Sequence, residues 1–333
     1  MKAIIPTAGF GTRLQPFTHT TPKVLLQVAD KPILGHIIEE LRKANVRDVT
    51  FVVGYLGDRI EEYVRRQYPD LNARFVEQAE PRGLGHAIYV TADLHRESAE
   101  PLLILLGDTV IDVDLAVLRG AETDRIGVAE VDDPHRFGIV ELDGERISAM
   151  VEKPERPKTN LAIVGIYYIT RPALLFECLD ENVERGMLTK GEIQLTDALQ
   201  RMLDKGVAMK AFKVEGWYDC GKPETLLSTN RALLDRRFPE GVEALRRRYP
   251  TAAIEPPVWI APSAQVSHSV VGPHVSIAGN AIVDGSVIQD SIINEGARVR
   301  GARLAGSIVG NGAIVSARTV RLYVGDKSEV TLE

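Results

Sequence analysis

The sequence predicts an α/β domain with a mainly parallel sheet and helices on both faces, followed by a helical connector and a parallel β-helix. Nearly continuous apolar runs alternate with amphipathic helical patterns over residues 1–228, which is typical of parallel strands buried between helices. A charged helical pattern then covers residues 229–252. From residue 253 on, aliphatic residues recur at six-residue spacing with glycine or asparagine between them, as in a β-helix.

The elements of the first domain follow one another in a regular order. Residues 2–6, KAIIP, form an apolar run that predicts a buried strand. Leu34, Ile37, Ile38 and Leu41 then fall at the i, i+3, i+4 and i+7 spacing of one helix face. The alternation continues with predicted strands at residues 49–54, 73–78 and 101–108 and predicted helices at residues 56–67 and 84–96. In such sheets, ligands bind at the carboxyl ends of the strands.

Beyond this domain the pattern changes twice. The connector, residues 229–252, reads as one or two charged amphipathic helices, with Pro239 and Gly241 as the break. Residues 253–333 show the six-residue period, which gives one aliphatic residue for each face of a triangular coil. A sandwich rich in valine and glycine is the alternative. The β-helix is favoured because the period persists through the series Val271, Ile277 and Val283, the series Val287, Ile293 and Val299, and the pair Val309 and Val315.

The composition argues against several classes of protein. The chain has 333 residues and a net charge of −6, which disfavours a general nucleic-acid binder but permits a local basic pocket. The two cysteines, Cys178 and Cys220, are too few for a disulfide framework or a thiolate metal site, so we expect a cytoplasmic location. We expect neither a signal peptide nor a membrane span, because the apolar runs are short.

The first predicted strand leads into the loop TAGFGTR, residues 7–13, which combines two glycines with a fixed positive charge. Glycine allows successive backbone N–H groups to converge on an anion. Arg13 adds a guanidinium fork for phosphate oxygens, and Lys23 adds a second cation. Neither of the two common phosphate-loop motifs is complete here. On spacing alone, a glycine turn with a surface arginine explains the loop equally well.

The loop resembles the signature of the sugar-1-phosphate nucleotidyltransferases, which is close to G-x-G-T-R-L-x-P-x-T followed by a lysine. Ala8 replaces the first glycine of the usual pair, a departure also found in the uridylyltransferase branch. The residues that match the signature are Gly9, Gly11, Thr12, Arg13, Leu14, Pro16, Thr18 and Lys23. Other segments resemble the family in the expected order over residues 1–230, namely EQAEPRGLGHAI, LLGDTVI, RFGIVELD, VEKPERPKTNLAIVGIYYI and GWYDCGKPETLLSTN.

The resemblance implies a Rossmann-like first domain, a left-handed β-helix of hexapeptide repeats, and a set of site residues. The implied catalytic residues are Arg13, Lys23 and Lys153. The implied nucleotide-binding residues are Ala8, Gly9, Gly11, Thr12, Gln78 and Gly83, of which the last two contact the base. The implied sugar-phosphate-binding residues are Gly138, Glu152, Lys153 and Val164, with Gly165 also shaping the pocket.

The resemblance also implies that Asp108 and Asp219 bind Mg²⁺. Asp108 follows an apolar run, which places a carboxylate at a strand end, and Asp219 lies in an aromatic-flanked loop. Mg²⁺ commonly takes one or two carboxylates together with phosphate oxygens and water. Taken alone, the G-D-T sequence is more often simply a turn.

Several other polar residues carry a structural alternative. Glu152 and Lys153 alternate along a strand, so they should point to opposite faces unless the strand twists or bulges. Glu192 and Asp197 are second-tier candidates that fit helix-start positions equally well. His86 is interpreted as structural, and neither it nor Lys213 is assigned a catalytic role. His268 and His274 lie in the repeat, where corner positions are often polar for the sake of solvent alone.

The implied reaction is attack by a sugar-1-phosphate oxygen on the α-phosphorus of a nucleoside triphosphate, which releases pyrophosphate. The segments are most similar to long-form glucose-1-phosphate thymidylyltransferase, with dTTP and glucose-1-phosphate as substrates. Ala8 and the segment GLGHA lean instead toward uridylyltransferases. One methyl group separates thymine from uracil and supplies only about 1–3 kcal/mol of discrimination. Dual use of dTTP and UTP is therefore compatible with the sequence.

Two further alternatives remain open at this point. The chain would be a non-catalytic, sugar-nucleotide-binding regulatory subunit if its charged site residues served binding alone. The retention of Arg13, Lys23, Asp108, Lys153 and Asp219 disfavours this. The β-helix is interpreted as an oligomerisation or regulatory module of a homo-oligomer. An acyltransferase is disfavoured because residues 254–333 hold only a few coils.

Overall fold

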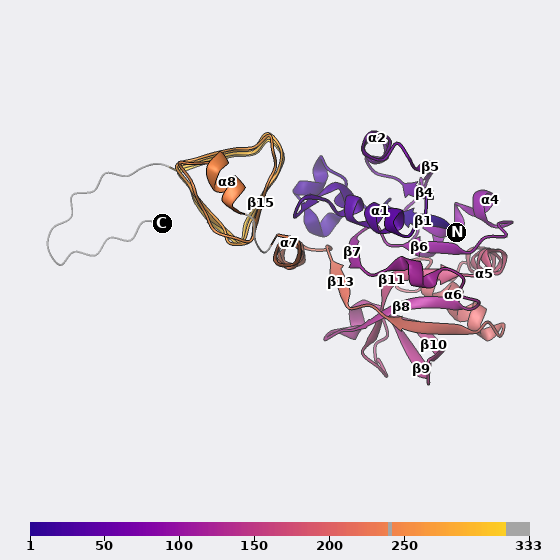
Figure 1. Cartoon of the computed structure of the whole chain (residues 1–333). Coiled ribbons are helices and arrows are strands. Elements are labelled where there is room, and N and C mark those ends of the chain that lie inside the picture. The colour runs from indigo at the N-terminus through magenta and orange to yellow at the C-terminus, as the bar shows by residue number, and fades with distance from the viewer. Residues whose placement is uncertain (239–241, 318–333) are drawn as a thin grey trace. The chain divides into compact units, whose positions relative to one another are not determined.

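A computed structural model describes residues 1–238 and 242–317. The predicted break at Pro239 and Gly241 and the last part of the predicted β-helix domain, residues 318–333, lie outside the described residues. The chain divides into two compact units (Figure 1). The first unit consists of Met1–Leu26 and Lys31–Thr229, and the second of Gln27–Asp30 and the chain from Asn230 onward. The division falls within helix α7 (Pro223–Arg237).

A nine-stranded sheet forms the centre of the first unit. Its order is β5 (Asn72–Glu77), β4 (Asp48–Val53), β1 (Lys2–Pro6), β6 (Leu102–Leu105), β11 (Leu161–Ile169), β8 (Asp124–Glu130), β12 (Met209–Lys213), β10 (Arg146–Glu152) and β9 (Gly138–Asp143). The strands from β5 to β6 are parallel, as the sequence predicts. From β11 onward the sheet is mixed, because β12 is parallel to β8 while the other pairs are antiparallel. The predicted Rossmann-like α/β core is confirmed, with antiparallel pairs in its second half.

Both faces of the sheet are buried at its central strands β1, β6 and β11, which explains why these strands are almost continuously apolar. The helices of this unit are α1 (Ile33–Lys43), α2 (Gly57–Gln67), α3 (Leu84–Tyr89), α4 (Ala92–His95), α5 (Pro172–Glu184) and α6 (Leu195–Asp204), so two short helices replace the single one predicted at residues 84–96. Ile4 and Ile104 belong to a core shared with α5 and α6. Ile5 and Leu103, their chain neighbours, are fully buried outside that core. Because successive strand residues point to opposite faces, apolar side chains are covered on both sides.

A separate two-stranded antiparallel sheet lies beyond the ends of the central strands. It pairs β7 (Thr109–Asp112) with β13 (Gly216–Asp219), two segments more than 100 residues apart in sequence. The remaining short elements are η1 (Thr12–Leu14), η2 (Phe17–His19), η3 (Lys23–Leu25), β2 (Gln27–Val28), β3 (Lys31–Pro32), η4 (Leu115–Leu118) and η5 (Pro134–Arg136). No helix in the part of the chain that the structure describes is long and apolar enough to cross a membrane.

The second unit contains a β-helix whose triangular cross-section is visible in Figure 1. Three parallel sheets form its walls, namely β14 (Ala253–Ile254), β17 (Val270–Val271), β20 (Val287–Gln289) and β23 (Arg303–Ala305); β15 (Val258–Ile260), β18 (Val275–Ile277), β21 (Ile292–Ile293) and β24 (Ile308–Val309); and β16 (Gln265–Ser267), β19 (Ile282–Asp284), β22 (Arg298–Arg300) and β25 (Ile314–Ser316). The predicted left-handed β-helix is thereby confirmed. Val242 of helix α8 (Val242–Arg248) and Tyr249, which follows the helix, both belong to the core of this unit. These side chains cover apolar surface at the end of the first coil.

The coils are shorter than a strict six-residue repeat requires, and this corrects one predicted inward residue. Val258 pairs with Val275 one coil later and Ser276 pairs with Ile292, so a coil takes 17 residues and then 16 rather than 18. One side of the first coil, and two sides of the next, are therefore one residue short. As a result, Ile288 is fully buried, whereas Val287, which the six-residue count placed inside, is 39% exposed. Sides of five or six residues are possible because Asn280, Gly285 and Gly296 adopt positive φ angles at the corners between them.

Candidate active site

The first unit contains a cavity of about 670 Å³ at the carboxyl ends of β1 and β6, the edge where the sequence predicts a site. The predicted site residues that line it are Gly9, Gly11, Thr12, Arg13, Lys23, Asp108, Gly138, Glu152, Lys153, Val164 and Asp219. The second-tier candidate Glu192 also lines it. Ala8, Gln78, Gly83 and Gly165 are not among the lining residues. Chain segments that are distant in sequence thus contribute to one cavity.

The glycine loop owes its shape to contacts that only glycine permits. Gly11 has a φ of 63°, and a Cβ there would lie 2.9 Å from Thr18 Cγ2 and 3.0 Å from Lys23 Cβ. The Thr18 hydroxyl donates a hydrogen bond to the Gly11 carbonyl oxygen at 2.9 Å. These contacts explain why glycine, threonine and lysine occur together in the signature. They hold the loop close to the segment that carries Lys23.

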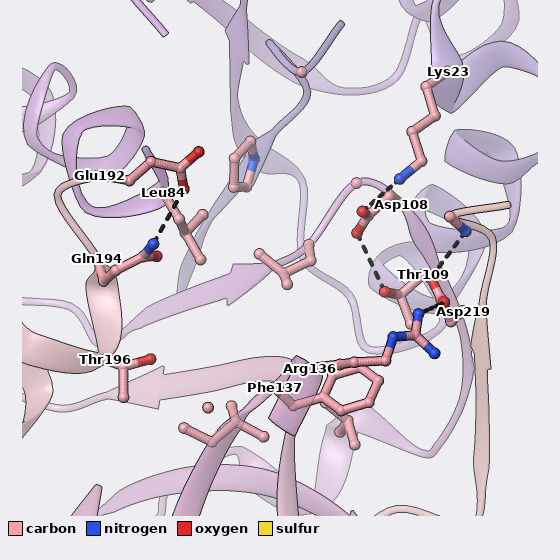
Figure 2. Close-up of a pocket in the computed structure, with 18 of the residues that line it drawn as sticks. Lys23, Leu84, Asp108, Thr109, Arg136, Phe137, Glu192, Gln194, Thr196 and Asp219 are labelled. Atoms are coloured by element: carbon pink, nitrogen blue, oxygen red, sulfur yellow. Dashed lines mark hydrogen bonds and ion pairs between the residues drawn. The ribbon is translucent and has the colours of Figure 1, made fainter. Parts of the chain in front are cut away.

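The two candidate metal ligands are brought together by the register of the β7–β13 sheet. Asp219 is paired with Thr109, and the Cys220 N–H donates to the Asp108 carbonyl oxygen at 3.1 Å. The two carboxylates therefore emerge at the same end of this small sheet (Figure 2). Lys23 Nζ lies 2.6 Å from Asp108 Oδ2, and an Arg136 nitrogen lies 3.6 Å from Asp219 Oδ2. The Gly221 N–H also donates to Asp219 Oδ1 at 2.9 Å.

The residues present fit a magnesium ion that is also bound by substrate. Two carboxylates facing one cavity match the one or two that Mg²⁺ usually takes, with water and phosphate oxygens completing the set. Within residues 1–238 and 242–317, no group of three or more His, Cys, Asp or Glu side chains is arranged to hold a metal ion. Burial favours a raised pKa for Asp108, but the attraction and hydrogen bond of Lys23, together with Arg13, outweigh it, and the pKa lies below its usual value. Asp108 is therefore an anionic oxygen donor at neutral pH.

The predicted sugar end of the cavity is built around Glu152 and Lys153. β10 ends at Glu152, and Lys153 has a φ of 42°, so strand alternation stops there and both residues line the cavity. Lys153 Nζ lies 3.3 Å from Glu152 Oε1, and the Thr196 hydroxyl donates to Glu152 Oε2 at 2.7 Å. A Cβ on Gly138 would lie 2.9 Å from Glu152 Oε2, so glycine leaves room for this carboxylate.

Three of the predicted nucleotide-binding residues lie outside the cavity lining: Ala8 and Gln78, which are buried, and Gly83, which is half-buried. Ala8 is buried against Gly54. The Gln78 amide nitrogen donates to the Gly83 carbonyl oxygen at 3.1 Å. Gly83 has a φ of 109°, and a Cβ there would lie 2.6 Å from the Ile193 carbonyl oxygen. The geometry therefore requires glycine at position 83, while the base contacts of Gln78 and Gly83 and the nucleotide contact of Ala8 stay predictions.

The structure adds residues that sequence analysis missed. The Arg136 guanidinium carbon lies 5.3 Å from the centre of the Phe137 ring (Figure 2). The Phe137 ring meets the Trp217 ring edge-on, with a centroid distance of 5.5 Å. Tyr167 also lines the cavity, and burial raises the pKa of its hydroxyl. Arg136 and Phe137 directly precede the recognised Gly138, and Trp217 lies two residues before Asp219. Their closeness in sequence to Gly138 and Asp219 is the feature from which these cavity residues could have been predicted. Asp197 lies in the first turn of α6, as the structural alternative predicts.

The comparisons with known proteins agree with this site. The family model described as nucleotidyl transferase matches residues 2–236. A low-salt glycan biosynthesis nucleotidyltransferase of Haloferax volcanii is 31% identical, and a glucose-1-phosphate thymidylyltransferase of Streptomyces antibioticus is also 31% identical, each over 100% of both chains. A solved UDP-glucose pyrophosphorylase in complex with UDP-glucose is 28% identical with a TM-score of 0.62, covering 71% of this chain and 99% of its own.

The chain belongs to the nucleotidyl transferase family. More specifically, its relatives are sugar-1-phosphate nucleotidyltransferases, among them thymidylyltransferases and uridylyltransferases. The resemblance stated from the sequence is therefore confirmed at the level of the family. Family members act on a nucleoside triphosphate and a sugar-1-phosphate.

Proposed function

We propose that the protein catalyses Mg²⁺-dependent transfer of a nucleotidyl group from dTTP to glucose-1-phosphate, which yields dTDP-glucose and pyrophosphate. The observation that carries the proposal is the convergence in one cavity of the Arg13 loop, the Asp108–Asp219 pair and the Glu152–Lys153 pair. The likeness of the whole chain to a thymidylyltransferase of Streptomyces antibioticus supports dTTP as the favoured triphosphate.

Each part of the cavity has a distinct role in this proposal. Arg13 and Lys23 bind the triphosphate, because two fixed cations offset the charge of a polyanion. Lys153 binds the phosphate of the sugar, and Glu152 accepts hydrogen bonds from sugar hydroxyls. The acceptor phosphate is already ionised at neutral pH, so no side chain has to remove a proton from it. Catalysis then depends on aligning the two substrates and neutralising charge on the leaving pyrophosphate.

Asp108 and Asp219 are the residues that would hold Mg²⁺. When bound, the ion supplies positive charge next to phosphate oxygens. The pairing of each aspartate with a cation, Lys23 or Arg136, supports this role, because both carboxylates face the cavity within reach of a positive charge. Lys23 released from Asp108 would be available to the triphosphate.

The main alternative is the same reaction with UTP. Ala8 and the likeness to a UDP-glucose pyrophosphorylase favour it. A regulatory subunit that binds sugar nucleotides without turnover is the alternative of another class. We further propose a cytoplasmic location, which accords with the free, buried Cys178 and Cys220, and a homo-oligomer in which the β-helix mediates association. Light scattering of the purified chain measures the oligomeric state.

The test is pyrophosphate release across a grid of five nucleoside triphosphates and four sugar-1-phosphates with Mg²⁺. Asp108→Asn is run beside Asp143→Asn, a control at the exposed end of β9 that does not line the cavity. Release that peaks with dTTP and glucose-1-phosphate and collapses only in Asp108→Asn is the expected result. A peak with another pair retains the mechanism and corrects the substrates. A folded protein that releases no pyrophosphate in any well is instead a binding or regulatory subunit.

A further inference from the structure

The side-chain amide of Gln78 is hydrogen-bonded through its nitrogen but not through its oxygen. The residue follows β5, at the carboxyl edge of the parallel half of the sheet, and is 7% exposed. Its nitrogen Nε2 lies 3.1 Å from the Gly83 carbonyl oxygen and 3.2 Å from His86 Nδ1. Among the described residues, no side chain or backbone group hydrogen-bonds its oxygen Oε1. Both protons of the amide are thus used within the protein, and its acceptor is not.

The Gly83 carbonyl oxygen is the first of two acceptors that orient this amide, and His86 Nδ1 is the second. A carbonyl oxygen only accepts hydrogen bonds, so the amide nitrogen and not its oxygen must face it. A flipped amide would bring two oxygens together at that distance. Gly83 itself has no freedom to turn, because its Cα lies against the Ile193 backbone, where an added Cβ would clash at 2.6 Å. The Gly85 N–H also donates to the Ile193 carbonyl oxygen at 2.8 Å, which holds the start of α3 in place.

The tautomer of His86 follows in turn. Because Gln78 Nε2 is a donor, His86 Nδ1 must be the acceptor, which places the single proton of the neutral ring on Nε2. Burial lowers the pKa of His86, and the charge of Arg82 lowers it further, against opposing effects of Glu80. The ring is buried and stacks on Tyr89 at a centroid distance of 5.9 Å. The neutral ring therefore accepts a hydrogen bond from the second amide proton of Gln78 through Nδ1.

We propose that His86 is a positioning residue that sets base specificity by holding Gln78 Oε1 as a hydrogen-bond acceptor for the base. The proposal rests on the proposed function and on the base contact that the family resemblance implies for Gln78. Thymine and uracil present an N3–H donor to such an acceptor, whereas cytosine presents a bare N3. With cytosine, two acceptors would face each other without a proton between them, which costs binding energy on both sides. A site built to bond one polar group discriminates strongly against a base that lacks it.

Without His86 Nδ1, the amide loses the acceptor for its second proton. Only the Gly83 carbonyl oxygen would then favour this orientation. A flip of the amide would cost one hydrogen bond instead of two, and it would turn Nε2 toward a cytosine N3. The structure thus assigns His86 an indirect role, since it acts through Gln78. This changes the interpretation of a histidine that the sequence alone presents as merely structural.

The experiment compares His86→Leu, which has no acceptor, with His86→Asn, whose Oδ1 stands near the position of Nδ1. His95→Leu is the control, because it removes another buried histidine, one bonded to Thr50 and not to Gln78. Isothermal titration measures Kd for dTTP and dCTP without sugar phosphate, and pyrophosphate release gives kcat/KM for both. We expect the dTTP preference over dCTP to fall at least tenfold in His86→Leu. It should stay within about threefold of the wild type in His86→Asn and His95→Leu.

An unchanged preference in folded His86→Leu overturns the proposal. If the wild type turns over dTTP and His86→Leu keeps the same base preference, only the role of His86 is refuted and the proposed function stands. If the wild type turns over no triphosphate, the proposed function is refuted instead. The Kd values for dTTP and dCTP then still test the role of His86. A further measurement needs no variant to fold. Nitrogen NMR of ¹⁵N-imidazole-labelled wild type should show His86 protonated at Nε2 and bare at Nδ1, and the opposite tautomer refutes the proposal.

Discussion

Ile288 and Val287 are adjacent residues of β20 that test the register of the β-helix. Ile288 is fully buried in the core of the second unit, and Val287 is 39% exposed. Ile288→Ala deletes three buried carbons, worth about 2.4 kcal/mol at about 0.8 kcal/mol each, and leaves a cavity in addition. We therefore expect a loss of about 3–4 kcal/mol. Val287→Ala deletes two half-exposed methyl groups and should cost about 1 kcal/mol or less.

Hydrogen exchange measured by mass spectrometry on the intact protein is the suitable assay, because it reports on each unit separately. Under conditions where exchange follows the opening equilibrium, a loss of 3 kcal/mol accelerates exchange of the most protected amides in the β-helix about a hundredfold. Val287→Ala should accelerate it less than tenfold, and protected amides in β1 should be unaffected by both. The reasoning is refuted if Val287→Ala costs as much as Ile288→Ala, since that outcome would restore a strict six-residue register.

Three further predictions concern the first unit. Arg136→Ala should lower kcat/KM for pyrophosphate release by about tenfold to a hundredfold, because Asp219 and the leaving group lose a cation. An unchanged kcat/KM would show that the guanidinium has no part in the reaction. Gly11→Ala should abolish most activity while the protein stays folded, since the positive φ and the clash with Lys23 displace the loop; near-normal turnover would contradict this. Burial lowers the pKa of His95 to about 4, below its unfolded value. The unfolded chain thus binds the proton first, so stability falls as pH drops from about 6.5 to 4, by at most about 3 kcal/mol. Urea unfolding across this range should be less pH-dependent in His95→Gln, and an equal pH dependence would argue against the buried histidine as its source.

Many features of this protein follow from local sequence. The parallel strands from β5 to β6 were predictable because their apolar runs alternate with helical patterns. The glycine loop was recognisable because its backbone geometry demands particular residues, as the contacts of Gly11 with Thr18 and Lys23 make clear. The β-helix was predictable because each coil repeats the same inward and outward pattern. These features depend on residues close together in the chain, so their chemistry is visible in order.

The site contains features that no local pattern reveals. Glu152 and Lys153 share the cavity because the strand ends between them and Lys153 takes a positive φ, which no alternation rule foresees. Arg136 reaches Asp219 across more than 80 residues of chain. The free acceptor of Gln78 depends on where Gly83 and His86 are held.

The family, the two kinds of fold and many of the residues that line the cavity were predictable from the chain alone, because motifs and periods encode them. The antiparallel strands, the inward residue of the pair Val287 and Ile288, and the meeting of Asp108 with Asp219 became visible only in the folded protein. Register and pairing depend on contacts between segments far apart in sequence. A shift of one residue in a coil or in a strand pair reverses which side a residue faces. A local pattern of apolar residues does not show where such a shift occurs.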